Sequence, residues 1–332
     1  MESKIEKRQK TTRWGKKGML KRYIMAFCFI CILAAMLSGC SKNEREDIDL
    51  VSSPGQPALH KEEVQKPTDE EAEPEPAVSY AVNPEGISLG ERFPEPEGFT
   101  RIQAEEGSFL EFMRDFTLKP DGSPVLLYNK EEKGNQSGHA AVFDLSLSER
   151  DLQQCADSIM RIYGEYYLER EAYDQIAFHL MNGFLMKYTQ WREGYRLNVD
   201  GNKTSMVKRA GADSSYESFL DYMNMVFAYA GTLSLEGECA GIGLDEIQAG
   251  DLFLKGGSPG HCVLAADMAE NEEGEKAFLL AQGFMPAQEF HIIKNPAHEE
   301  DPWYYASEIS YPLLTPGYTF PENSLMRWKD GL

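Results

Sequence analysis

The sequence has 332 residues, of which 42% are hydrophobic and 11% aromatic, so the chain can bury a substantial core and is not disordered as a whole. Acidic residues outnumber basic ones by 54 to 33, which gives a formal net charge of −21. Residues 1–39 hold nine of the basic residues and two acidic ones, so the remainder carries −28. Because such a surface repels phosphate backbones, we expect no nucleic-acid partner.

The first forty residues carry the pattern of an export signal. Nine Lys and Arg precede or open an apolar run from Tyr23 to Leu37, which is shorter than the roughly 20 residues that span a bilayer. The run ends in Leu-Ser-Gly-Cys at 37–40, which resembles a bacterial lipobox. We therefore expect residues 1–39 to be a lipoprotein signal peptide and Cys40 to carry acyl chains such as palmitate. An uncleaved anchor helix is the alternative.

The composition then changes twice along the chain. Residues 40–86 are rich in acidic residues and proline, most clearly at 67–76, and offer little to bury. Such a segment is expected to be a disordered, self-repelling stalk. Residues 87–332 are expected to form one globular domain, which would lie outside the cytoplasm, tethered to the cell membrane or outer membrane by lipid.

Cysteine and histidine spacing argues against a metal site. Cys28 and Cys31 lie inside the apolar run, and the three cysteines that follow Cys40 have no metal-ligand spacing and allow one disulfide at most. The chain lacks an H-E-x-x-H motif, and His179 and His291 are expected on polar faces of strands. We expect neither a bound metal nor a cofactor.

The first long helix of the globular part is expected to begin at a capping box. Ser148-x-x-Asp151 fits that motif, and apolar residues then recur every three or four positions from Leu152 to Tyr166. Cys155 falls on this stripe, so it is expected on the buried face of the helix.

The remaining pattern predicts an α+β fold. Before residue 231 we expect a short helix after Ser108, strands at 125–128, 140–143 and 176–180, a hairpin turning at 200–201, and a helix over 215–230 that Gly231 ends. After it, strands are expected at 251–254, 262–266, 277–281 and 290–293. Helices followed by a run of strands favour helices packed on a mostly antiparallel sheet.

The segment from Ile247 to Leu264 resembles the core of the NlpC-type papain-like cell-wall peptidases and amidases. It has a Gly-Asp strand, a glycine loop and a Gly-His strand. The resemblance implies a papain-like C-terminal half, in which a thiolate at a helix N-terminus attacks an amide. It also implies that His261 is the base and that Gln282, after the next strand, orients the imidazole.

The nucleophile that this resemblance requires is not where the pattern places it. The matching helix opens Asp213-Ser214-Ser215, where the family has Asp-Cys-Ser, so Ser214 takes the cysteine position. A serine hydroxyl has a far higher pKa than a thiol, which normally removes activity from such a site. Cys155, in a core helix, and Cys262, expected on the sheet face opposite His261, are weaker candidates.

A second resemblance covers nearly the whole globular part. Several blocks occur in the order found in the domain of unknown function 4846, whose members are bacterial secreted proteins and lipoproteins: residues 151–157, 191–196, 229–235, 259–261 and 282–288. Within the second block, Trp191 and Arg196 are candidates for a stacking wall that binds a sugar or peptide. A packed aromatic with an ion pair is the alternative.

Besides a purely structural envelope component, which needs no cleft, two functions remain open from the sequence. One is a membrane-anchored lipoprotein that hydrolyses amides in peptidoglycan stem peptides, with His261, Gln282 and Ser214 or an unrecognised thiol in the site. The other is a noncatalytic envelope-binding module with a degenerate hydrolase cleft. A nucleophile within about 3–4 Å of His261 would discriminate between them.

Overall fold

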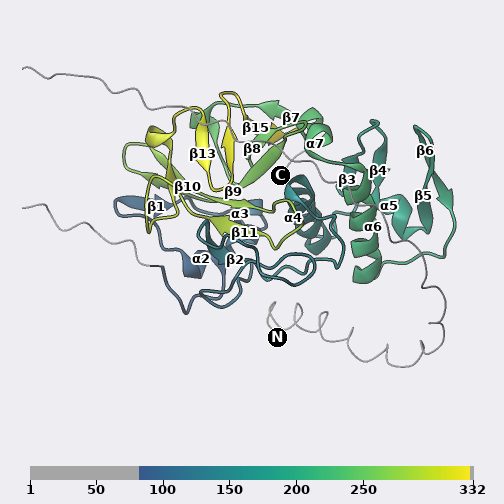
Figure 1. The fold of residues 1–332 in the computed structure, drawn as a ribbon, viewed down its shortest axis with the longest axis horizontal. Helices are drawn as coiled ribbons and strands as arrows, with labels where there is room; N and C mark the ends of the chain where they lie inside the picture. The colour runs from purple at the N-terminus through teal and green to yellow at the C-terminus, as the bar shows by residue number, and fades with distance from the viewer. Residues whose placement is uncertain (1–81, 330–332) are drawn as a thin grey trace, which may run out of the picture. The chain divides into compact units, whose positions relative to one another are not determined.

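An antiparallel sheet of nine strands organises the part of the chain that the structure describes, residues 82–329 of a computed structural model (Figure 1). Its main path runs β2-β11-β10-β9-β8-β15-β7, with β1 beside β9 and β12 beside β10. These strands are β1 (Phe99–Arg101), β2 (His139–Val142), β7 (Cys239–Gly241), β8 (Leu252–Lys255), β9 (His261–Asn271), β10 (Lys276–Gln282), β11 (His291–Ile293), β12 (Tyr304–Tyr305) and β15 (Leu325–Trp328).

Helices and three small hairpins complete the fold. The helices are α2 (Leu89–Arg92), α3 (Phe109–Arg114), α4 (Cys155–Glu169), α5 (Tyr188–Arg192), α6 (Tyr216–Tyr229) and α7 (Thr232–Glu238), with short 3-10 turns at Leu244–Glu246 and Ala306–Glu308. The hairpins pair β3 (Ala177–His179) with β4 (Leu185–Lys187), β5 (Tyr195–Asp200) with β6 (Lys203–Lys208), and β13 (Leu313–Thr315) with β14 (Tyr318–Phe320). The α+β expectation is confirmed.

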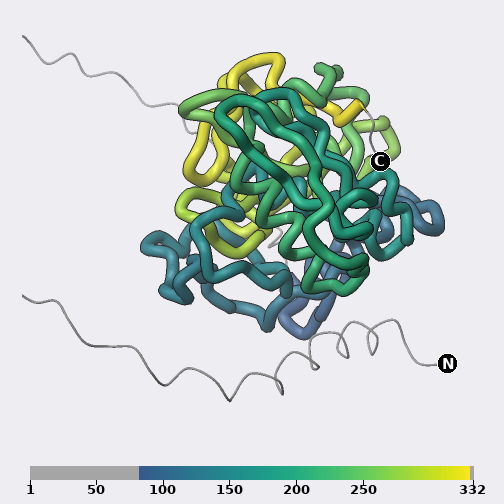
Figure 2. Tube along the Cα trace, turned by 90° about the vertical axis from the view of Figure 1, so that its right-hand side faces the viewer, coloured from purple at the N-terminus to yellow at the C-terminus, as the bar shows by residue number. Residues whose placement is uncertain are grey.

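The core forms where α4 packs against the longest strand, β9. All but the last two residues of β9 are buried, and β10 beside it is buried from Ala277 onward, so both strands are covered on both faces. From the helix, Ile159, Ile162 and Tyr163 are fully buried. Figure 2 shows the teal and green chain from α4 to α6 lying in front of the yellow-green strands.

Most elements lie where the sequence pattern predicts them. The helix after Ser108, the hairpin at Gly201, the helix over 216–229 and all four late strands are confirmed within a few residues. Residues 125–128 form only isolated bridges, because Leu126 pairs with Glu132 in a local turn. Gly231 is the N-cap of α7, so it starts a helix as well as ending α6.

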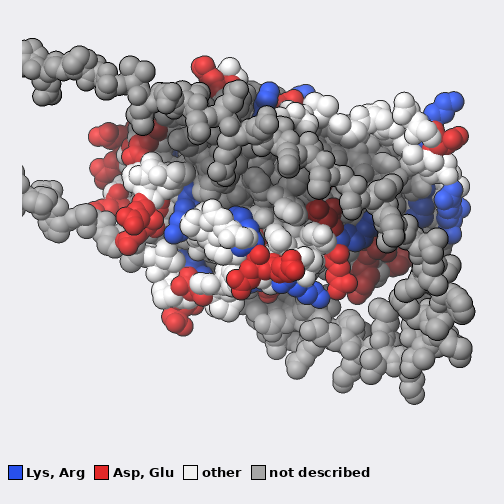
Figure 3. Space-filling view, in the orientation of Figure 1, with Lys and Arg blue, Asp and Glu red and all other residues white. Residues whose placement is uncertain are grey.

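Charged groups are distributed over the described surface and, in one place, buried. On the part of the face left visible in Figure 3, Lys and Arg are interspersed with groups of Asp and Glu. Inside the fold, the Asp267 carboxylate is fully buried on β9 and bonds two guanidinium groups: Arg101 Nε at 2.9 Å and Arg114 Nε at 2.7 Å. This ion triad links β1 and α3 to the central strand β9.

Removing that carboxylate tests how far the triad stabilises the fold. We expect Asp267→Ala to lower the free energy of unfolding by about 3 kcal/mol, because two partly buried arginines lose their counter-charge. Urea unfolding followed by tryptophan fluorescence measures it. The matched control is Glu149→Ala, whose pair with Lys130 is exposed on both sides and should change stability by less than about 0.5 kcal/mol. Equal effects of the two variants would contradict a stabilising role for the triad.

Candidate active site

Cys155 is the first residue of α4, not an interior residue of an earlier helix. Gln154 is the N-cap, and its backbone N–H donates to Asp157 Oδ2 at 3.1 Å, as in a capping box. Ser148 instead closes a local turn with Arg150. The expected helix start at Ser148 is therefore wrong, and the correction moves Cys155 from a buried stripe to a helix N-terminus, where the helix dipole stabilises a thiolate.

The environment of Cys155 favours its charged form. A hydrogen bond from the Cys262 thiol, a hydrogen bond with His261, the charge of that imidazole and the Ala156 N–H together lower the pKa of Cys155 to about 4, although burial opposes them. Residue 155 is partly exposed, so it lies at the boundary between the core and solvent. A thiolate at neutral pH is the attacking species of cysteine hydrolases.

His261 lies at the start of β9 and is held by Gln282 at the end of β10. The Nε2 atom of His261 is 2.7 Å from Oε1 of Gln282. Since an amide oxygen only accepts, Nε2 carries the proton, and Nδ1 is the nitrogen left to accept a proton from Cys155. This is the contact between His261 and Gln282 that the NlpC resemblance implies.

Close approach of the backbone brings the three side chains together. Strands β9 and β10 are antiparallel neighbours, so the beginning of one lies beside the end of the other. Immediately after Gln282, Gly283 lies so close to α4 that a Cβ there would stand 2.2 Å from Ser158 Oγ and 2.9 Å from the Gln154 carbonyl oxygen. Glycine at this position lets the end of β10 touch the first turn of the helix.

Aromatic rings line the imidazole on its other sides. The ring of His261 lies 4.7 Å from that of Phe284 and 5.0 Å from that of Tyr318, and Phe320 stacks at 5.9 Å. His261 is 2% exposed, so water reaches little of it. Tyr318 is partly exposed, and its pKa is raised by burial and by the nearby charge of Cys155. These rings restrict the movement of the base and shield it from solvent.

Cys262, which was expected on the sheet face opposite His261, lies beside Cys155. Its thiol is fully buried and hydrogen-bonds Cys155, because the first turn of α4 packs against the start of β9. Burial and the neighbouring thiolate raise the pKa of Cys262 well above its usual value. It therefore stays protonated and acts as a donor to Cys155, not as a nucleophile.

Ser214 is not placed to attack. It precedes α6 on the exposed surface, and its hydroxyl accepts a hydrogen bond from Arg192 Nε at 3.2 Å. The helix that faces His261 is α4. Helix α6 packs on α4, and Figure 1 shows α4 between β9 and α6. The sequence-based assignment of Ser214 as nucleophile is thus corrected: the helix chosen by its Asp-Ser-Ser start was the wrong one.

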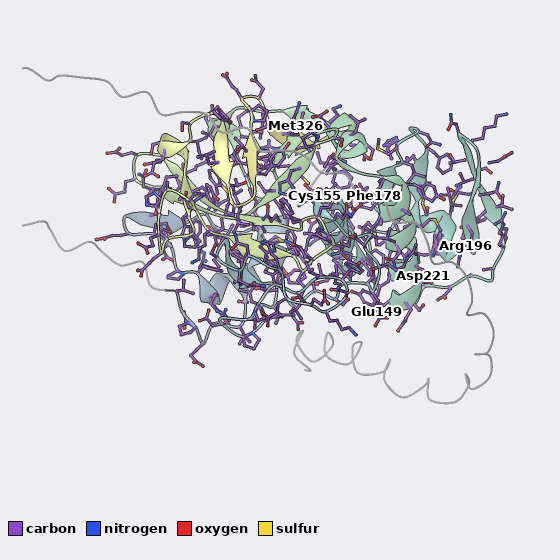
Figure 4. The ribbon with its side chains drawn as sticks, viewed as in Figure 1. Glu149, Cys155, Phe178, Arg196, Asp221 and Met326 are labelled. Carbon is purple, nitrogen blue, oxygen red and sulfur yellow. The ribbon has the colours of Figure 1, made fainter. Side chains whose placement is uncertain are left out.

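Trp191 and Arg196 pack against each other instead of forming a ligand-binding wall. Trp191 is 3% exposed, its indole N–H donates to Ser218 Oγ at 3.2 Å, and the Arg196 guanidinium covers its ring at 4.2 Å. Arg196 belongs to strand β5 of the β5–β6 hairpin, and Figure 4 shows it well apart from Cys155. Because both faces of the indole are occupied or buried, the stacking expectation is corrected to a structural role.

His291 is the site residue that sequence reasoning missed. It was expected on a polar strand face, yet it is fully buried on β11, with Nε2 3.4 Å from Gln282 Nε2.

For Cys155, the sequence did contain a signal of its position at a helix N-terminus, since Gln154-x-x-Asp157 also fits a capping pattern. Glutamine is a rarer N-cap than serine, so the pattern favoured Ser148.

The remaining expectations concern metal binding, membrane-spanning helices and the N-terminal residues that the structure does not describe. Among residues 82–329, no group of three or more His, Cys, Asp or Glu is arranged to hold a metal ion. In the same range, no helix is long and apolar enough to cross a bilayer. The segment expected to be a signal peptide, Cys40, and nearly all of the segment expected to be a stalk lie outside the described residues.

The thiolate character of Cys155 can be measured without a substrate. Between pH 5 and 8 we expect the rate of its alkylation by iodoacetamide to be nearly constant, because the pKa near 4 keeps it ionised. An ordinary thiol, with a pKa of about 8.5, would gain about tenfold per pH unit over this range. Peptide mapping by mass spectrometry assigns the label among the six cysteines.

Two variants make this measurement decisive. His261→Ala should move the midpoint of the Cys155 profile toward that of an ordinary thiol, because it removes a hydrogen bond and a positive charge. Cys239→Ala should leave the profile unchanged, since burial raises the pKa of that thiol to about 12. A wild-type rate that rises tenfold per pH unit from pH 5 would contradict the assignment of Cys155 as an activated thiol.

Comparison with known proteins places the chain in a family. The family model described as domain of unknown function (4846) matches residues 89–327, which include every residue of the site. Neither the curated proteins nor the solved structures contain a significant match. A match over most of the sequence establishes membership, so this chain belongs to the domain of unknown function (4846) family.

Proposed function

We propose that the protein is a cysteine hydrolase that cuts amide bonds, with Cys155 as nucleophile, His261 as base and Gln282 as the group that orients the base. One observation carries the proposal. The thiol that begins α4 lies close enough to the imidazole that begins β9 for the imidazole to lower the thiol's pKa, and that imidazole is held at 2.7 Å by the amide that ends β10. These are the residue types and the chain geometry of papain-like enzymes, in which a helix N-terminus lowers the pKa of the thiol.

The proposed reaction has two steps. In the first, the Cys155 sulfur bonds to the amide carbon, the C–N bond breaks, and His261 gives the proton it took from the thiol to the leaving amine. In the second, water attacks the thioester while its proton passes to His261, and the C–S bond breaks to restore Cys155. The tetrahedral oxygen of each step lies near the helix N-terminus, where the Cys155 N–H has no partner within the helix.

The proposed substrate is the stem peptide of peptidoglycan. The resemblance of residues 247–264 to the cell-wall peptidases supports this class, as does the export pattern of residues 1–40. We propose accordingly that lipid at Cys40 holds the protein on the cell membrane or outer membrane, with its globular domain outside the cytoplasm.

The alternative function is a noncatalytic binding module, which the sequence left open because the helix expected to carry the nucleophile has no cysteine. Cys155 supplies a thiol from another helix, which favours the enzyme.

Digestion of purified sacculi tests the activity. We expect the wild-type protein to release fragments with new amino termini, detected by mass spectrometry and by labelling of free amines. Cys155→Ala should abolish release, and His261→Ala should lower it by about 10²–10⁴-fold, as loss of a general base does. Ser214→Ala is the matched control and should retain wild-type release, because that hydroxyl bonds Arg192 on the surface.

The results separate the chemistry from the substrate. Intact sacculi together with a pH-independent, reactive Cys155 would contradict the stem-peptide substrate alone. An unreactive Cys155 would contradict the hydrolase as a whole. Equal release by wild type and Cys155→Ala would assign the cleavage to another residue or a contaminant.

Lipid attachment is tested separately in cells. Metabolic labelling with an alkyne analogue of palmitate should mark the wild-type protein, and Cys40→Ala should abolish the label and shift the protein out of the membrane fraction. Cys28→Ala should remain labelled, because that thiol lies within the proposed signal peptide. Labelling of Cys40→Ala at the wild-type level would contradict lipidation at this residue.

A further inference from the structure

Four neighbouring strands bring a row of polar side chains to one end of the sheet. His261 lies on β9, Gln282 on β10, His291 on β11 and His139 on β2, and these strands are consecutive in the sheet. Of these residues, His261 and Gln282 belong to the proposed reaction. His291 lies behind Gln282, out of contact with solvent, and the reaction as described does not use it.

We propose that His291 is a positioning residue that fixes the orientation of the Gln282 amide, and through it the tautomer of His261; this rests on the proposed function. The argument follows hydrogen bonds from the interior toward the site. In this series of hydrogen bonds, each atom acts either as a donor or as an acceptor. The donor and acceptor of the first bond therefore determine those of the bonds that follow.

The first bond fixes the proton on His291. Its Nδ1 atom is 2.8 Å from the backbone carbonyl oxygen of Glu289, and a carbonyl oxygen can only accept. Nδ1 therefore carries hydrogen. Burial, and repulsion from Lys133, His139 and His261, lower the pKa of His291 to about 3, so the ring is neutral at physiological pH. A neutral ring with hydrogen on Nδ1 presents a lone pair on Nε2.

The second bond fixes the amide of Gln282. Its Nε2 atom lies 3.4 Å from Nε2 of His291 and 3.4 Å from the carbonyl oxygen of Pro316, two acceptors suited to its two hydrogens. Flipping the amide would turn its oxygen toward both acceptors and its NH₂ group toward His261. That arrangement replaces two attractions with two repulsions inside the protein, where an unpaired polar group is costly.

The third bond reaches the proposed catalytic pair. With the amide so oriented, Oε1 accepts from His261 Nε2, and Nδ1 is the nitrogen that takes the proton of Cys155 and then faces the thiolate. In a flipped amide, the NH₂ group would face Nε2 of His261 and favour a lone pair there. The hydrogen of the ring would then be on Nδ1, and Nδ1 could not accept the proton of Cys155. His291 therefore determines which nitrogen faces the thiol without itself contacting Cys155 or the substrate.

Two substitutions of His291 separate this role from simple packing. His291→Leu fills the space but offers no acceptor to Gln282, whereas His291→Gln can place an amide oxygen near the position of Nε2. We expect His291→Leu to raise the midpoint of the pH profile for Cys155 alkylation by about one pH unit or more, a tenfold change in the thiolate population. His291→Gln should stay within about half a pH unit of wild type. Unlabelled Cys262 in both proteins, read from the same peptide maps, shows that the core is intact.

A measurement on the wild-type protein covers the case in which His291→Leu does not fold. Nitrogen-15 NMR of histidine-labelled protein distinguishes the two neutral tautomers. We expect hydrogen on Nδ1 alone for His291, assigned by the loss of its signals in His291→Gln. For His261, assigned in His261→Ala, we expect hydrogen on Nε2 in every state and on Nδ1 as well while Cys155 is a thiolate. Hydrogen on Nε2 of His291 would overturn the proposal, as would a folded His291→Leu with the wild-type alkylation profile. Neither result would contradict the hydrolase itself, which fails only if wild-type Cys155 behaves as an ordinary thiol.

Discussion

The contact between the first turn of α4 and the start of β9 is the constraint on which the site depends. Asp157 caps the helix at Gln154, and this cap determines that Cys155 is the first helical residue. If the helix began one turn earlier, Cys155 would lie inside it. As the first helical residue, Cys155 faces His261, and the helix dipole stabilises its thiolate. The buried packing of α4 on β9 then holds the thiol and the imidazole next to each other.

The site is built as a layered arrangement in which each group orients the next. Cys262 and His261 both bond the thiol, Gln282 bonds His261, and His291 backs Gln282. The outer members are buried, and rigid strands position them, so their rotamers are restricted. Such support is what holds a catalytic group in a productive geometry. The partly exposed Cys155 is the member of this set through which the site meets solvent.

The pattern of the sequence predicted the strands better than the nucleophile. Strands β8 to β11 contain short apolar runs between Gly, Pro and Asn, so they could be located by composition alone, although β9 continues to Asn271, beyond the predicted end at residue 266. The cysteine could not, because Ser148-x-x-Asp151 and Gln154-x-x-Asp157 are competing capping patterns and local propensity favours the serine. Pairing His261 with a helix required knowing which helix packs on its strand, and that contact joins segments about a hundred residues apart.

By itself, the sequence determined the α+β class and the late strands, because these follow from local periodicity and from the order of elements. The pairing of His261 with Gln282 came from the resemblance to the NlpC-type peptidases, and the structure places the two side chains in contact. Tertiary structure alone decided that Cys155, not Ser214, meets the imidazole, that Trp191 is covered by Arg196, and that His291 is buried behind Gln282. The reason is physical: hydrogen bonds and burial depend on which distant segments pack together, and local propensity carries no information about that.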